Sequence, residues 1–193
     1  MKRKSPRKPK QALKNKTVLL CVSGSIAAYR ACDVVRELKA EGADVFCLMT
    51  EAAKHFVSPL TFHSLSGHPV YSDPFSNQED WAVLHTTLAD RADLILMVPA
   101  TADLLARMAH GFANDLVTSV LLASKAPVLI APAMNDHMFS HPMTQENIKK
   151  LSRIGYQFID PIEGDLVCGR IGMGHIQETE VILKAVRNIL HVR

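Results

Sequence analysis

Residues 132–139 bring together the side chains best suited to bind a ligand. The segment Pro132-Ala133-Met134-Asn135-Asp136-His137-Met138-Phe139 places one amide, Asn135, between a proline and two methionines. It follows the apolar run at 126–131, a pattern that indicates a buried strand. In an open α/β sheet, ligands bind beyond the carboxyl ends of the strands, so the segment is expected to border a site.

A second candidate is the late segment at 164–174, which contains four glycines and one thiol, Cys168. This composition is typical of a mobile flap that closes over a substrate and delivers the thiol. The alternative is a surface loop with an incidental cysteine. A free cysteine among glycines, away from the core, favours the functional interpretation.

The earliest loop, Ser23-Gly24-Ser25-Ile26, offers two hydroxyls and a glycine at the start of a helix. Backbone N–H groups and the helix dipole favour a phosphate there. The loop lacks the G-x-G-x-x-G spacing of dinucleotide-binding proteins, which argues against NAD. A serine that only caps a tight turn explains the loop equally well, and the loop alone does not decide.

Two further loops follow predicted strands. Thr50 begins one of them and can cap the helix after it. In the other, Thr101, Ala102 and Asp103 follow Pro99-Ala100, and these small side chains would let a flat ligand approach the backbone.

Among the nine histidines, His85 stands at the start of a short helix leading into the third strand. An imidazole there can act as a base near neutral pH, although a lone histidine is more often structural. His137 and His141 are four residues apart, which suggests zinc. No metal site is expected, because the H-E-x-x-H glutamate is missing and Pro142 interrupts the helix.

Apolar strands alternate with helical patterns along the chain. Strands are predicted at 17–22, 43–49, 94–98, 126–131 and 156–159. Helices are predicted from about 28 to 41 and at 51–56, 59–66, 101–110, 114–124, 142–153 and 178–191. Strands separated by helices predict an α/β domain with a single doubly wound, mostly parallel sheet.

Charge and composition narrow the class further. Residues 1–16 hold eight Lys and Arg and no acid; removing these eight from the total of 22 leaves 14 basic against 19 acidic residues. We therefore expect a solvated, disordered tail at 1–16, a folded domain at 17–193 and no nucleic-acid partner. No apolar run reaches the length of a membrane span. Four cysteines without C-x-x-C spacing indicate reduced thiols and a cytoplasmic protein.

Taken together, these motifs resemble one family. The Ser23-Gly24-Ser25 loop, the His85 segment, Pro99-Ala100-Thr101, the Asn135 segment and Cys168-Gly169 occur in the order seen in the homo-oligomeric FMN-containing cysteine decarboxylases. The resemblance covers about residues 16–190 and implies a Rossmann-like flavoprotein fold. It implies that FMN lies with its phosphate against Gly24, Ser25 and Ile26 and is lined by Thr50, Thr101, Ala102, Asp103 and Leu104.

The resemblance also implies an activity, the decarboxylation of 4′-phosphopantothenoylcysteine to 4′-phosphopantetheine in coenzyme A biosynthesis. The substrate thiol is oxidised to a thioaldehyde, CO₂ leaves, and the enethiol is reduced again. By the same resemblance His85 assists the oxidation, Asn135 binds the substrate carboxylate, and Cys168 protonates the enethiol. Met134 and Val167 are expected to line the substrate site.

Two alternatives remain open at this point. A relative acting on the C-terminal cysteine of a peptide would share the FMN loops, His85 and Asn135. A non-catalytic flavin-binding regulator would share the fold, but such proteins tend to lose the histidine or the flap cysteine, and this chain keeps both. The resemblance further implies a homotrimer or homododecamer. A separate phosphopantothenate–cysteine ligase is also expected, because the sequence ends at Arg193.

Overall fold

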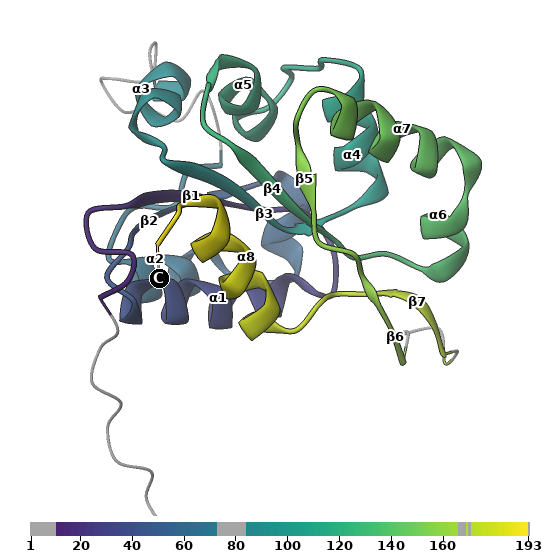
Figure 1. Cartoon of the computed structure of the whole chain (residues 1–193), viewed down its shortest axis with the longest axis horizontal. Coiled ribbons are helices and arrows are strands. Elements are labelled where there is room, and N and C mark those ends of the chain that lie inside the picture. The colour runs from purple at the N-terminus through teal and green to yellow at the C-terminus, as the bar shows by residue number, and fades with distance from the viewer. Residues whose placement is uncertain (1–10, 73–83, 166–168, 170, 193) are drawn as a thin grey trace, which may run out of the picture.

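The protein is described by a computed structural model that covers residues 11–72, 84–165, 169 and 171–192. Its centre is a parallel sheet of five strands in the order β2-β1-β3-β4-β5 (Figure 1). The strands are β1 (Thr17–Val22), β2 (Asp44–Met49), β3 (Leu94–Ala100), β4 (Val128–Pro132) and β5 (Gln157–Phe158). The predicted α/β fold with a doubly wound sheet is therefore confirmed.

Helices cover both faces of the sheet (Figure 1). On one face lie α1 (Ala28–Ala40), α2 (Pro59–Ser66) and α8 (Thr179–Ile189); on the other lie α3 (Leu84–Arg91), α4 (Ala102–Ala109), α5 (Leu116–Ala123) and α7 (Pro142–Arg153). Two short helices, η1 (Glu51–His55) and α6 (Asp136–Ser140), follow β2 and β4. In the part of the chain that is described, no helix has the length and apolarity needed to cross a bilayer.

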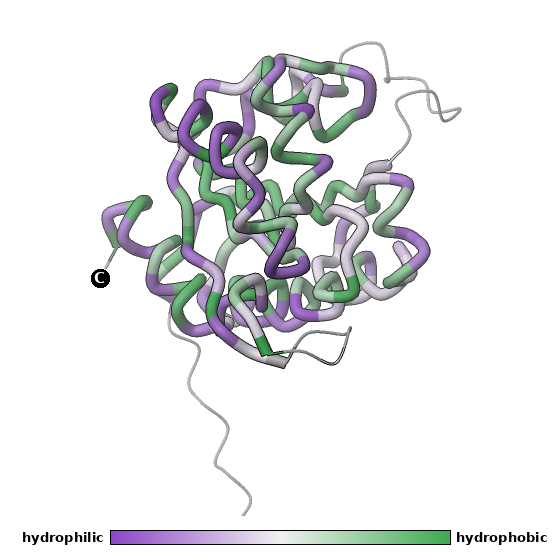
Figure 2. The backbone as a smooth tube through the Cα atoms, turned by 90° about the vertical axis from the view of Figure 1, so that its right-hand side faces the viewer, coloured by the Kyte–Doolittle hydropathy of each residue, from purple (hydrophilic) through white to green (hydrophobic). Residues whose placement is uncertain are grey.

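The strands are apolar along nearly their whole length because both faces of the sheet are covered. Every residue of β3 is buried, and in β1 and β2 only the first residue is not fully buried. Parallel strands covered on both faces need this continuous apolar pattern rather than an alternating one. Figure 2 shows the hydrophobic segments gathered inside and the hydrophilic ones toward the outside.

The strand order creates one point at which the chain changes direction across the sheet. From β1 the chain moves to β2 on one side, and it then returns to β3 on the other side of β1. Doubly wound sheets of this order bind ligands in the crevice between the carboxyl ends of β1 and β3. The fold thus assigns the loops at Ser23 and Thr101 to the two walls of one crevice.

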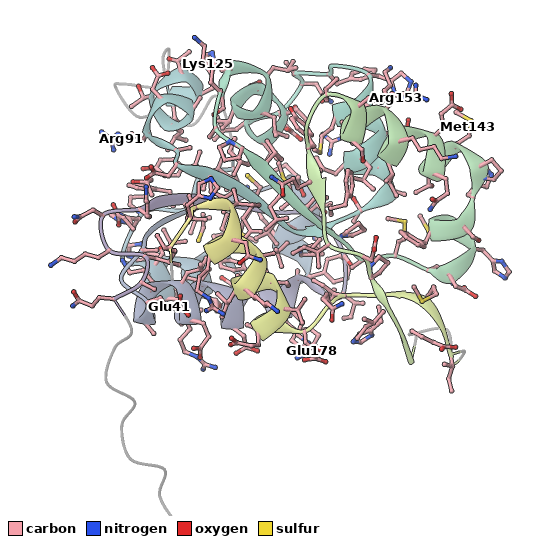
Figure 3. The ribbon with its side chains drawn as sticks, in the orientation of Figure 1. Glu41, Arg91, Lys125, Met143, Arg153 and Glu178 are labelled. Carbon is pink, nitrogen blue, oxygen red and sulfur yellow. The ribbon has the colours of Figure 1, made fainter. Side chains whose placement is uncertain are left out.

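Helix α8 is fastened to α1 through an ion pair. Glu41, at the carboxyl end of α1, is labelled in Figure 3. Arg187 of α8 donates to this buried carboxylate and also to Glu180, at 2.8 Å. Because Glu41 is only 7% exposed, the pair is shielded from solvent and fixes the last helix against the first.

The packed body begins before residue 17, the residue at which the sequence predicted the start of the folded domain. Residues 11–16, assigned above to the tail, form a turn whose Leu13 side chain is fully buried. The Leu13 N–H donates to the carbonyl of Glu41 at 2.9 Å, and the Lys16 ammonium lies 3.6 Å from Asp93. The basic composition obscured this, because one buried leucine among lysines gives no periodic signal. Residues 1–10 lie outside the described residues.

The glycine-rich segment is the second departure from expectation. Its arms form β6 (Ile162–Asp165) and β7 (Ile171–His175), an antiparallel pair separate from the main sheet. The sequence predicted one sheet and read the glycines as unsuited to regular structure. The arms are nevertheless strands, since β7 packs against residues 134–136, a tertiary contact that strand propensity does not include. Val167 and Cys168 lie outside the described residues.

We predict that Leu13→Ala lowers the free energy of unfolding by about 2 to 4 kcal/mol, because it leaves a cavity in the core. Lys14→Ala is the matched control; its side chain is exposed, and a change within about 0.5 kcal/mol is expected. Urea denaturation of the two variants at equal protein concentration measures the difference. Equal stability of both variants would contradict the placement of Leu13.

Candidate functional site

Hydrogen bonds continue from loop to loop past the carboxyl ends of the strands. The Thr50 N–H, after β2, donates to the Val22 carbonyl of β1 at 3.0 Å. The Ala133 N–H, after β4, donates to the Ala100 carbonyl of β3 at 3.0 Å. Each loop therefore starts from a fixed position, and the site is built on the sheet itself rather than on independent loops.

Ser23 joins the two loops at the crevice. Its hydroxyl donates to the Pro99 carbonyl at 2.7 Å and accepts from the Thr101 N–H at 3.0 Å. The side chain is 2% exposed. Pro99 has no N–H, and the β3–β4 register shifts between Met97 and Ala100. Ser23 thus holds β1 and β3 together beside a proline that cannot contribute a donor of its own.

The loop after β1 presents backbone donors at the amino end of α1. The Ser25 hydroxyl accepts from the Ala27 N–H at 3.2 Å. Within the described residues, no acceptor engages the N–H groups of Gly24 and Ile26. A helix N-terminus with such donors is suited to a phosphate. Gly24, Ser25 and Ile26 therefore remain a candidate anion site.

Glycine is required at position 24 for a packing reason as well. A β-carbon there would stand 2.4 Å from the Cβ atom of Ala52 in η1, which is far inside van der Waals contact. The loops after β1 and β2 can lie against each other only because residue 24 has no side chain. This close approach places Thr50, which precedes η1, beside the N–H groups of Gly24 and Ile26, which form the candidate phosphate cradle.

Thr50 and Thr101 both cap helices. The Thr50 hydroxyl accepts from the Ala53 N–H, and the Thr101 hydroxyl accepts from the Leu104 N–H, each at 3.3 Å. A hydroxyl that accepts in this way still has its own proton to donate. Both threonines can therefore fix a helix and donate to a ligand at the same time.

The remaining residues of the third loop have other contacts. Leu104 is fully buried in the core, so only its backbone can face a ligand. The Asp103 carboxylate accepts from Arg107 Nε at 3.0 Å, and Arg107 also pairs with Asp115, the N-cap of α5. Ala102 is partly exposed at the start of α4. In this loop, Thr101 and Ala102 are the residues best placed to touch a ligand.

Asn135 is the N-cap of α6. Its Oδ1 accepts from the His137 N–H at 3.0 Å, and a donor fixes that end of the amide as the oxygen. The NH₂ end of Asn135 is thereby the end that can donate to a substrate. The neighbouring Met134 N–H donates to the Gly174 carbonyl of β7 at 3.1 Å. Asn135 and Met134, both partly exposed, thus stand on the same edge of the sheet as the cradle.

His85 is not brought to this edge within one chain. It lies in the first turn of α3, which packs on α5; the Ser124 hydroxyl at the end of α5 donates to the Ala89 carbonyl of α3 at 3.2 Å. Helix α6 packs instead on α7 and β7, and Figure 1 shows α3 and α6 at opposite ends of the molecule. The structure therefore separates His85 from Asn135.

Two other cysteines are unsuited to chemistry. Cys21 in β1 and Cys47 in β2 are fully buried. Burial raises the pKa of the Cys47 thiol to about 12 and raises the pKa of Cys21 as well. Neither forms a thiolate near neutral pH, so neither is a candidate catalytic thiol.

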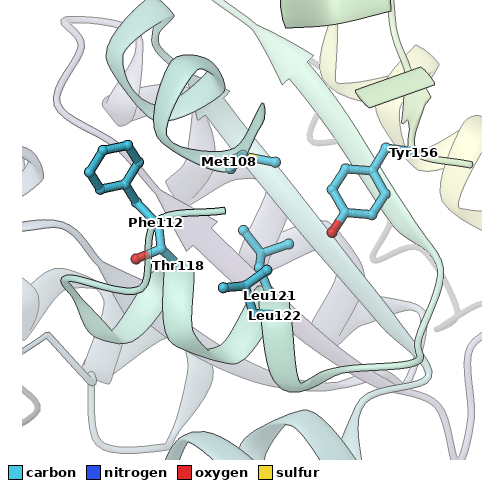
Figure 4. A pocket seen from close by; sticks show the side chains of 6 residues that line it. All are labelled: Met108, Phe112, Thr118, Leu121, Leu122 and Tyr156. Carbon is cyan, nitrogen blue, oxygen red and sulfur yellow. The ribbon is translucent and has the colours of Figure 1, made fainter. Parts of the chain in front are cut away.

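A shallow apolar pocket lies elsewhere, between α4, α5 and the residue before β5 (Figure 4). It is lined by Met108, Phe112, Thr118, Leu121, Leu122 and Tyr156. None of the predicted site residues contributes to it. The Thr118 hydroxyl is engaged by Asp115 within the cap of α5.

The chain is similar to known proteins in both sequence and structure. The model of the flavoprotein family matches residues 6–191, and the chain belongs to that family. The chain is 45% identical to the probable phosphopantothenoylcysteine decarboxylase of Streptococcus mutans over 91% of its own length and 99% of that protein. It is 51% identical to the coenzyme A biosynthesis bifunctional protein CoaBC of Bacillus subtilis over 89% of its length. The chain spans 42% of that longer relative.

Among solved structures, a phosphopantothenoylcysteine decarboxylase variant is similar at a TM-score of 0.81 and 30% identity. The match covers 91% of this chain and 98% of that one. In the variant a serine replaces a cysteine, and the protein is complexed with pantothenoylaminoethenethiol.

Sequence reasoning missed Ser23 and the glycines of β7 as parts of the site. The sequence indicated the Ser23 segment only as a phosphate loop. A hydroxyl directly after a buried strand is nevertheless well placed to bridge to the neighbouring strand. For Gly172 and Gly174 no sequence signal exists beyond their spacing, because the contact partner is a distant turn.

We predict that Ser23→Ala lowers the stability by about 1 to 3 kcal/mol, since it leaves the Thr101 N–H without its acceptor in a buried place. The flavin should also bind more weakly, because the walls of the crevice are no longer joined. Urea denaturation of the flavin-free protein and fluorescence titration with flavin measure the two effects.

Ser64→Ala is the control for this substitution, since the exposed Ser64 hydroxyl donates to the Leu60 carbonyl of its own helix. The bridging role of Ser23 would be disproved by flavin affinities that are equal in the two variants.

Proposed function

We propose that the chain is an FMN-dependent decarboxylase of 4′-phosphopantothenoylcysteine. The observation that carries the proposal is the shared sheet edge: a phosphate cradle at the β1 loop, the crevice between β1 and β3, and the Asn135 amide after β4. A cofactor and a carboxylate-bearing substrate would meet at that edge. The relatives described above support the same activity.

The residues of the crevice fit FMN. The phosphate would be held by the N–H groups of Gly24 and Ile26 and by the Ser25 hydroxyl. Thr50 and Thr101 would donate from either side, and Ala102 leaves room for a flat ring. When bound, FMN supplies a two-electron oxidation of the substrate thiol and the later return of those electrons.

Asn135 prepares the carboxylate for loss. Oxidation of the thiol to a thioaldehyde places the carboxylate β to an electron-withdrawing C=S group, so CO₂ can leave. The Asn135 NH₂ group orients the anion through a hydrogen bond but carries no charge. A strong ion pair would stabilise the ground state more than the transition state and would slow the loss.

Cys168 and Val167, which lie outside the described residues, have two further roles in the proposed reaction. Cys168 would protonate the enethiol while it is reduced, and Val167 would line the substrate site with Met134. The similar variant in which a serine replaces a cysteine, found with an aminoethenethiol compound, supports this role for the thiol. Reduced thiols also accord with a cytoplasmic location.

The separation of α3 from α6 suggests how His85 takes part. A histidine needed at the oxidation step must approach the substrate, and within one chain its helix, α3, lies at the opposite end of the molecule from α6. A second copy of the chain can supply it, with each copy giving His85 to its neighbour's site. Such head-to-tail contacts close into rings, of which the trimer expected from the resemblance is an example.

The experiment that tests the activity uses the purified, FMN-loaded protein. Mass spectrometry should show loss of CO₂ from 4′-phosphopantothenoylcysteine and none from a peptide ending in cysteine. The reverse result would favour the peptidyl-cysteine decarboxylase. No reaction with either substrate, in protein that holds flavin, would favour the non-catalytic regulator.

Asn135→Asp should lower kcat/KM for decarboxylation by about 100-fold or more, because it replaces a donor by a second anion. Aspartate caps helices as well as asparagine does, so α6 should persist. Asn188→Asp, on the exposed side of α8, is the control and should act at the normal rate. Activity of Asn135→Asp near that of the control would remove the amide from the mechanism.

Co-expression of the variants His85→Ala and Asn135→Asp, each nearly inactive alone, should restore activity at about one site in three of each mixed trimer if neighbours share them. The two chains carry different tags, so that only assemblies containing both are assayed for CO₂ release. Mixed assemblies that remain inactive would show that His85 and Asn135 do not act across a subunit contact.

A further inference from the structure

Strand β7 passes directly against the turn that carries Asn135. The Met134 N–H donates to the Gly174 carbonyl at 3.1 Å. Gly174 lies where the β6–β7 register shifts, between the pairs Ile162–His175 and Glu163–Met173, so β7 has one residue more than β6 there. Such bulges redirect a strand and recur beside active sites.

Gly174 leaves no room for a side chain. A β-carbon at this position would stand 2.1 Å from the carbonyl oxygen of Met134, which is backbone and cannot turn aside. Its φ of +144° is also a conformation that glycine adopts and other residues rarely do. Two independent constraints therefore require glycine at this contact.

Gly172 makes the equivalent contact on the other side of Asn135. A β-carbon there would lie 2.8 Å from the Asp136 Cβ atom and 3.0 Å from its Oδ2 atom. Met134 and Asp136, on either side of Asn135, thus each lie against a glycine of β7. Met173, between the two glycines, is 45% exposed.

The turn is held from its other end as well. The Ala133 N–H donates to the Ala100 carbonyl of β3, so the turn leaves the sheet at a fixed point before it reaches β7. Between these anchors, the Asn135 amide is oriented by the His137 N–H. The location of the amide along the sheet edge therefore depends on how closely β7 approaches.

We propose that Gly172 and Gly174 are positioning residues for Asn135, a role that rests on the proposed function. The side-chain-free surface of β7 sets the place from which the Asn135 NH₂ group reaches the substrate carboxylate. A methyl group at either glycine separates the turn from β7 and displaces the amide. The atoms nearest to these glycines belong to residues 134–136 and not to the β1 loop, so the cradle there is expected to stay intact.

The test compares two probes on the FMN-loaded protein by isothermal titration calorimetry. One is the serine analogue of 4′-phosphopantothenoylcysteine, whose hydroxyl cannot be oxidised as the thiol is. The other is the same compound without its carboxylate. The ratio of the two affinities reports carboxylate recognition alone, and Asn135→Ala defines its loss, expected at about 10- to 100-fold.

Gly174→Ala should lower this ratio by at least about fivefold while the flavin affinity stays unchanged. Gly155→Ala is the matched control. Gly155 also has a positive φ, +96°, but a β-carbon there would meet nothing within 4 Å. The control also places a side chain at a positive φ but without the crowding, so its ratio should remain that of the unsubstituted protein.

A second set of variants, at Gly172 and Asp136, tests the inference if Gly174→Ala does not fold. Gly172→Ala should also lower the ratio, and combining it with Asp136→Gly removes the β-carbon that it meets. The double variant should recover the ratio of Asp136→Gly alone. A general loss of stability would not be reversed in this way, so recovery isolates the contact.

Two outcomes would overturn the inference: unchanged ratios in folded Gly172→Ala and Gly174→Ala, or equal losses for both probes. Failure of the proposed function looks different. In that case Asn135→Ala itself would leave the ratio unchanged, whatever the glycine variants do.

Discussion

The site depends on hydrogen bonds that continue beyond the strands at the carboxyl edge of a parallel sheet. The Thr50 N–H donates to β1, and the Ala133 N–H donates to β3. The Ser23 hydroxyl bonds to the end of β3 and to the loop that follows it. Because the strands are parallel, all their carboxyl ends meet at one edge, and each of these bonds fixes one loop relative to the next. A ligand site on such an edge is organised before any ligand arrives, which lowers the entropy lost on binding.

Close approach of backbones is the second constraint. Gly24 lets η1 lie on the β1 loop, and Gly172 and Gly174 let β7 lie on the Asn135 turn. The missing β-carbons of Gly24 and Gly174 bring backbones distant in sequence into direct contact, and that of Gly172 makes room for the Asp136 side chain. Side chains on long stems would leave the phosphate cradle and the amide free to shift, whereas backbone contacts of this kind hold them to within fractions of an ångström.

The two ends of the molecule have different tasks in the proposed reaction. The edge with the cradle and Asn135 would bind the cofactor and the carboxylate, while α3 would carry its histidine to another copy. A site shared in this way forms only in the assembly, so oxidation of the thiol would await a complete site. A site shared between copies would also require the chain to associate, as the resemblance to an oligomeric family implies.

The sequence alone determined the five strands, most helices and the loops that border the site, because apolar periodicity and strand-end motifs are local properties. Thr17–Val22, Pro59–Ser66 and Pro142–Arg153 were predicted with the bounds observed. The tertiary structure decided the burial of Leu13, the pairing of β6 with β7 and the bridging role of Ser23. It also decided the distance between His85 and Asn135. These depend on partners far away in the chain, and local patterns carry no record of which distant backbone a glycine or a hydroxyl will meet.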